Sequence, residues 1–88
     1  ETAVADARRA LSVQMASGDP GNLPYIRDTL CRALTGLGEE RGDRAALAEA
    51  IANCEQAVGE FKAADAAEFV AATEGNLAGA RKALSALQ

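Results

Sequence analysis

The stretch from Leu37 to Val58, LGEERGDRAALAEAIANCEQAV, constrains the fold more than any other part of the chain. It contains the end of one helical pattern, a very short connection and the start of a second helical pattern. Gly42 suits the left-handed conformation that ends a helix, and Asp43 is a favoured residue for capping the next one. A connection this short places the two helices antiparallel as neighbours. The sequence therefore predicts at least one antiparallel helix pair.

Apolar residues recur at helical spacing along four segments, which predicts helices at about 2–16, 23–41, 44–64 and 66–87. The third segment follows the pattern without a break. The predicted inward faces are formed by Val4, Ala7, Leu11 and Met15; Ile26, Leu30, Ala33, Leu34 and Leu37; Leu47, Ala50, Ile51, Cys54, Ala57, Val58 and Phe61; and Val70, Thr73, Leu77, Ala80, Leu84 and Leu87. Because the sequence has no strand pattern and no linker, we expect one all-α domain over residues 1–88.

Several residues suit the predicted helix ends. Gly18 and Pro20 are expected to end the first helix, and Asn22 is expected to cap the second. Asp65 is expected to cap the fourth helix, with Glu68 three residues further on as a variant of the capping box.

Several glycines lie inside the predicted helices. Gly36 and Gly38 are expected to weaken the second helix by up to ~1 kcal/mol each relative to alanine. Gly75 and Gly79 lie one turn apart on the fourth helix. That spacing fits either a close contact with another helix or simple tolerance of glycine.

Charge and hydropathy argue against two classes of partner. The net charge is −4 and acidic and basic residues are interspersed, so no basic stripe predicts nucleic-acid binding. No apolar run approaches the ~18–20 residues that span a bilayer, and no signal-peptide pattern is visible. The sequence therefore predicts a cytoplasmic protein without membrane contact. The high content of alanine, arginine and glycine indicates a GC-rich bacterial genome.

The core is expected to be thin. Hydrophobic residues make up 49% of the chain, but many are alanine, and the only aromatic residues are Tyr25, Phe61 and Phe69. Cys31 and Cys54 both lie inside helical patterns, so each is expected to be a small buried hydrophobic residue. A disulfide or a reactive thiol is the alternative.

The sequence contains no convincing catalytic set. It has no histidine, which removes the usual general base and the commonest metal ligand. Glu39 and Glu40 are adjacent on a helix, so their side chains diverge and are typical of a solvated face. We therefore predict no catalytic residue, no metal site and no cofactor.

The chain also matches itself when it is shifted by 47 residues. Ala3–Leu11 then aligns with Ala50–Val58, and Leu30 aligns with Leu77. Because the apolar pattern persists across the intervening loop, the first helix is interpreted as equivalent to the third, and the second to the fourth.

These segments resemble the tetratricopeptide repeats (TPR), a family of antiparallel helix pairs, in its longer-period bacterial type. Leu30–Gly38 looks like the end of the family's first helix, and Gly42–Val58 looks like its turn and second helix. Ala50, Cys54 and Ala57 match the small–aromatic–small positions of that second helix.

The resemblance implies stacked helix hairpins, with one complete pair over residues 23–64 between two half-repeats; an up-down four-helix bundle is the alternative fold. It also implies a non-catalytic scaffold that binds a peptide or protein partner on the face of the second and fourth helices. The implied binding residues are Asp28, Arg32, Thr35, Asn76, Gly79 and Lys82. The alternative function is a self-associating helical bundle, a homo-oligomer, or a fragment of a longer repeat protein.

Overall fold

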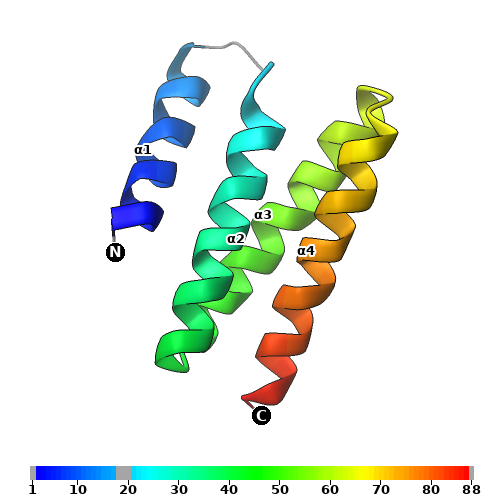
Figure 1. Cartoon of the computed structure of the whole chain (residues 1–88). Coiled ribbons are helices and arrows are strands. Elements are labelled where there is room, and N and C mark those ends of the chain that lie inside the picture. Colours follow the sequence, from blue (N-terminus) through cyan, green and yellow to red (C-terminus); the bar gives the residue numbers. More distant parts are fainter. Residues whose placement is uncertain (1, 18–20, 88) are drawn as a thin grey trace.

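The computed structural model describes residues 2–17 and 21–87, which form four α-helices (Figure 1). These are α1 (Thr2–Ser17), α2 (Leu23–Arg41), α3 (Arg44–Ala63) and α4 (Ala67–Ala86). The all-α class and the four predicted helices are confirmed, and every boundary lies within one residue of its predicted place. Gly18 and Pro20, which were expected to end the first helix, lie outside the described residues.

The joint between α2 and α3 forms as predicted. Gly42 ends α2 in the left-handed conformation, with φ 63°. The backbone N–H of Asp43 donates to the carbonyl oxygen of Gly38 at 3.0 Å. The Asp43 carboxylate then accepts from the backbone N–H of Ala46 at 3.1 Å, which caps α3.

Gly38 has a different role from the one predicted. It is buried where the end of α2 meets the start of α3. A Cβ atom at this position would lie 2.5 Å from Cγ of Leu47 and 2.7 Å from its Cδ2. The close approach of the two helices therefore requires glycine here, so the residue does more than weaken a helix turn.

The prediction that Asp65 caps α4 is wrong. Asp65 has φ 57°, whereas an N-cap residue normally takes an extended conformation. Its backbone N–H donates to the carbonyl oxygen of Lys62 at 3.1 Å, and the N–H of Ala66 donates to that of Phe61 at 2.9 Å. These two bonds form a Schellman motif, so Asp65 ends α3. Asn22 does precede α2, but its side chain makes no capping hydrogen bond.

The helices form an open row in which α1 and α4 are the two edges (Figure 1). α3 packs on both α2 and α4, α1 packs on α2, and α2 also contacts α4. Within the described ranges, α1 and α4 do not touch, as they would in a closed four-helix bundle. The molecule is accordingly flat, with extents of 37 × 26 × 14 Å.

The core is thin, as predicted. Its buried apolar residues are Val4, Ala7, Leu30, Cys31, Leu34, Ala46, Leu47, Ala50, Cys54, Ala57, Val58, Phe61, Leu77, Ala80 and Ala83. The prediction for Met15 is wrong, since its side chain is 58% exposed. The described part of α1 packs mainly on α2, and its Arg8 also pairs with Glu49 of α3 at 2.6 Å. It buries Val4 and Ala7 near its beginning, and its last turn projects into solvent.

All three aromatic rings meet at one end of the row. Tyr25 at the start of α2 contacts Phe61 and Phe69 edge-on, with ring centroids 5.1 and 5.0 Å away. Phe61, from the end of α3, stacks on Phe69, from the start of α4, at 5.2 Å. Tyr25 and Phe69 are each 44% exposed. This aromatic cluster joins three helices at one end of the molecule.

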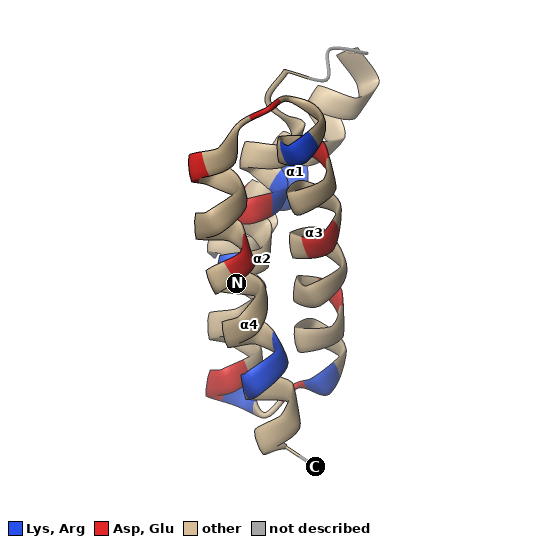
Figure 2. Ribbon diagram, turned by 90° about the vertical axis from the view of Figure 1, so that its right-hand side faces the viewer, with Lys and Arg blue, Asp and Glu red and all other residues tan. Residues whose placement is uncertain are grey.

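Acidic and basic residues are interspersed along the helices, as Figure 2 shows. Arg27 forms the least exposed ion pair among the described residues: its Nε lies 3.1 Å from Oε1 of Glu60, and its Nη1 donates to Gln56. The pair of Arg81 with Glu55 at 2.9 Å also bridges two helices, but both of its side chains are more than half exposed.

Candidate functional site

A shallow groove of about 250 Å³ runs between α2 and α4, the two helices that carry the predicted binding residues. The helices lie close enough to contact each other, and both rest on α3. The groove is lined by Arg32, Thr35, Gly36 and Glu39 from α2 and by Gly75, Asn76 and Gly79 from α4. We call this surface the α2–α4 groove.

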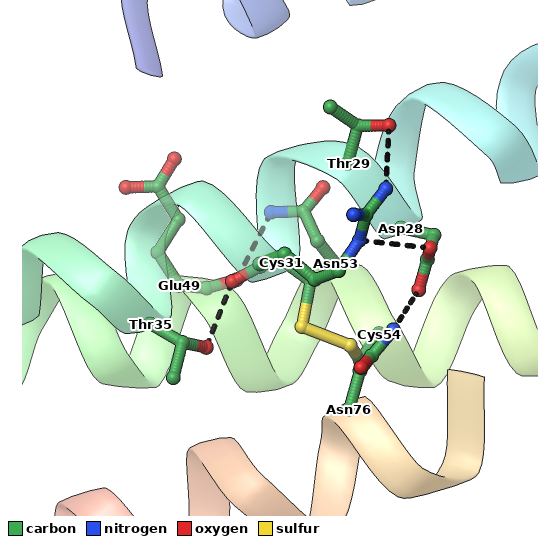
Figure 3. The surroundings of a disulfide bond; sticks show 9 residues. Asp28, Thr29, Cys31, Thr35, Glu49, Asn53, Cys54 and Asn76 are labelled. Atoms are coloured by element: carbon green, nitrogen blue, oxygen red, sulfur yellow. Dashed lines mark hydrogen bonds and ion pairs between the residues drawn. A yellow bond between two sulfur atoms is a disulfide. The ribbon is translucent and has the colours of Figure 1, made fainter. Parts of the chain in front are cut away.

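A polar network crosses one side of the groove (Figure 3). The Asn76 amide nitrogen donates to Oδ1 of Asp28 at 2.9 Å, and Arg32 Nε lies 3.3 Å from the other carboxylate oxygen. Arg32 Nη2 also donates to the hydroxyl of Thr29 at 3.4 Å. The Asp28 side chain is only 18% exposed, whereas that of Arg32 is 57% exposed. The network therefore fixes Asp28 and Asn76 and leaves part of the Arg32 guanidinium open to solvent.

The glycines of the groove are not explained by packing within the chain. A Cβ atom at Gly36, Gly75 or Gly79 would meet no other heavy atom within 4 Å. Gly38, one half-turn from Gly36, is the opposite case, because Leu47 occupies the space that its Cβ would need. The glycines on both walls of the groove thus leave helix backbone accessible to whatever approaches it.

The structure brings most of the predicted binding residues together. Arg32, Thr35, Asn76 and Gly79 line the groove, and Asp28 joins them through its bonds to Arg32 and Asn76. Thr35 donates its hydroxyl hydrogen to the carbonyl oxygen of Cys31 at 2.8 Å. Lys82 is exposed further along α4 and does not line the groove. It makes no ion pair with any residue in the described ranges.

Three groove residues were not predicted as binding residues: Gly36, Glu39 and Gly75. Helical spacing contained the signal for all three, since Gly36 follows Arg32, and Glu39 follows Thr35, by four residues. Gly75 precedes Gly79 by the same interval. Extending each predicted position by one helical turn would have found all three.

The structure corrects the prediction that Cys31 and Cys54 are separate buried residues. Both are fully buried, as expected, but they form a disulfide between α2 and α3 and are not separate hydrophobic residues. Their Cα atoms lie 5.5 Å apart, which is ordinary for a disulfide. The sequence predicted that each cysteine is a buried residue within its helix. It did not show that the two side chains meet at the same height.

A larger depression of about 410 Å³ lies on the outer side of the turn between α3 and α4. Its lining consists of Lys62, Asp65, Ala66, Ala67, Val70, Ala71 and Glu74. Its one ion pair, Lys62 with Glu74 at 3.9 Å, joins two side chains that are each more than half exposed. Because it has no fixed polar group comparable to Asp28 and Asn76, we regard the smaller α2–α4 groove as the better candidate site.

Residues 2–17 and 21–87 contain neither a metal-binding cluster of side chains nor a membrane-spanning helix. No group of three or more histidine, cysteine, aspartate or glutamate side chains is placed to hold a metal ion. None of the helices in these ranges has both the length and the apolar content to cross a membrane.

Comparisons of the whole chain with protein-family models, with curated proteins and with solved structures find no significant match.

Proposed function

We propose that the chain is a non-catalytic, TPR-like interaction module that binds a peptide or protein partner in the α2–α4 groove. The contacts between helices support a repeated unit, because α1 packs on α2 and α3 packs on α4, while α2 and α4 contact each other. The groove between these two equivalent helices joins a fixed polar network to accessible backbone.

The glycines are the observation on which this proposal rests. A glycine inside a helix costs about 1 kcal/mol relative to alanine. No contact within the chain requires Gly36, Gly75 or Gly79, because the space beside each is open. A partner that approaches the helix backbone closely would use that space and would account for all three.

The test begins with selection of peptides from a displayed random library against the oxidised protein. The affinity of a selected peptide is then measured by fluorescence anisotropy for the wild type and for Gly36→Leu and Gly79→Leu. Each leucine fills part of the groove, so we expect the dissociation constant to rise at least about tenfold, or about 1.4 kcal/mol.

Gly59→Leu is the matched control. Gly59 is an exposed glycine inside α3 with open space beside it, but it does not line the groove. Its substitution should leave the affinity unchanged. If both groove variants bind the selected peptide as the wild type does, the peptide lies elsewhere and the proposed site is wrong. Arg32 lines the groove and Lys82 does not, so charge reversal at each residue tests them separately. An unchanged affinity for the selected peptide would remove that residue from the binding site.

Self-association is the second candidate function, and the outward face of α4 favours it. Glu68, Ala71, Gly75, Ala78 and Lys82 share the exposed side of this helix. Within the described residues, neither Glu68 nor Lys82 forms an ion pair. Each lies seven residues from Gly75, so two antiparallel copies of α4 that cross at Gly75 would place each Glu68 opposite a Lys82.

Charge exchange tests this pairing by light scattering over a hundredfold range of concentration. Glu68→Lys and Lys82→Glu should each give a monomer, because each sets like charges opposite one another. Mixing the two single variants should restore a dimer, and the double variant should also restore it. A wild type that stays monomeric throughout, or single variants that dimerise as the wild type does, would rule out this interface.

A cytoplasmic location and a bacterial source stay predictions from the sequence. The disulfide points away from the first of these, because structural disulfides persist mainly in oxidising compartments.

A further inference from the structure

The disulfide lies at the centre of the molecule. Cys31 is in the middle of α2, Cys54 is in the middle of α3, and both side chains are wholly buried. The surrounding core contains mostly alanine and leucine, and α3 contacts α2 on one side and α4 on the other. The bond thus joins two helices where large apolar side chains are scarce.

The same bond lies directly beneath the polar network of the groove (Figure 3). Asp28 and Thr35 flank Cys31 on α2, about one turn away on either side. Thr35 is tied to the Cys31 carbonyl oxygen, and Asp28 is tied to Asn76 of α4. The segment of α2 that bears the groove residues is therefore covalently fixed to α3 at its midpoint.

We propose that the Cys31–Cys54 disulfide is an oxidation-dependent lock, and that the chain reaches its stable form, with α2 held against α3 and α4, only in an oxidising compartment. In the locking reaction both thiols are oxidised by a small-molecule disulfide such as oxidised glutathione. One new Sγ–Sγ bond forms, the reagent's S–S bond breaks, and the two cysteine protons and two electrons end on two molecules of reduced glutathione. This inference does not depend on the groove having a partner.

Burial determines how the lock opens. A thiolate must reach one sulfur of the disulfide to reduce it. Neither sulfur is reachable while α2 and α3 remain packed, because both cysteine residues are 0% exposed. Reduction therefore has to wait until the helices separate, and its rate should follow that opening. Removing the bond also frees a loop with a sequence separation of 23, which favours the unfolded chain.

The first experiment compares urea unfolding of the oxidised and the dithiothreitol-reduced protein by far-ultraviolet circular dichroism. The reduced chain keeps both sulfur atoms in the core, so packing volume is nearly unchanged. We expect the midpoint to fall by about 2 M urea or more. The Cys31→Ala/Cys54→Ala variant is the control, since its midpoint must not respond to the reductant. Equal midpoints for the oxidised and reduced wild type would overturn the proposal.

The second experiment measures the rate at which alkylatable thiols appear, by mass spectrometry, as the dithiothreitol concentration is raised. A buried lock predicts a rate that levels off at the rate of helix opening. A rate that rises in proportion to dithiothreitol over the whole range, and equals that of an unstructured peptide disulfide, would show an open bond and overturn the proposal. Neither experiment uses a groove ligand, so their failure is distinct from failure of the proposed function.

Discussion

Gly38 and Gly36 lie two residues apart on α2, but their surroundings differ. Gly38→Ala would place a methyl group 2.5 Å from Cγ of Leu47, so the joint between α2 and α3 would have to open. We expect the free energy of unfolding to fall by about 1–3 kcal/mol, as for overpacked cores. Gly36→Ala meets no atom within 4 Å and should raise it by up to about 1 kcal/mol. Urea unfolding measures both, and equal effects would contradict this distinction.

Asp65 allows a second test at the scale of one residue. Its positive φ favours glycine, so Asp65→Gly should raise the free energy of unfolding by about 1 kcal/mol. Asp65→Asn should be nearly neutral, because asparagine also tolerates this conformation. If Asp65 instead capped α4, as the sequence predicts, replacement by glycine would lower stability by a few tenths of a kcal/mol. The sign of the change, measured by thermal unfolding, therefore separates the two roles.

At the scale of helices, ion pairs that bridge two elements differ in burial. Arg27 lies on α2 with its side chain 13% exposed and contacts two residues of α3. Arg27→Ala would leave Glu60 half-buried without its partner, so we expect a loss of about 1–2 kcal/mol in the free energy of unfolding. Arg81→Ala removes a mostly exposed pair between α3 and α4 and should cost less than about 1 kcal/mol. Equal losses in urea unfolding would contradict this ranking.

Helical periodicity explains how much of these elements was predictable. It identified the four helices and the inward positions of Leu30, Leu47 and Leu77, because those depend on spacing along one chain segment. It did not predict where along their lengths α2 and α3 pack on each other. That relative position is what brings Cys31 and Cys54 together. For the same reason the gathering of the three aromatic rings was not predicted. Four residues that line the α2–α4 groove had been named through the family resemblance and not through periodicity, and their role in binding stays a prediction.

At the scale of the whole molecule, an open row predicts a gradient of stability. α3 contacts a helix on each side, whereas the described part of α1 packs on α2 and reaches α3 through the ion pair of Arg8 with Glu49, which is largely exposed. We expect backbone amides of α1 to exchange hydrogen fastest among the four helices, and those in the middle of α3 slowest. Val4→Ala removes one of the buried contacts of α1, and it should speed exchange in α1 without a comparable change in α3. Uniform protection across all four helices would contradict the gradient.

The aromatic cluster determines which part of the molecule near-ultraviolet spectroscopy reports on. The chain has one tyrosine and no tryptophan, so its near-ultraviolet absorption and emission come mainly from Tyr25. That ring touches Phe61 and Phe69, so its signal reports the joint of α2, α3 and α4 at one end of the row. Far-ultraviolet signals report all four helices together. The difference between melting midpoints at the two wavelengths therefore measures how far this end separates before the helices themselves are lost.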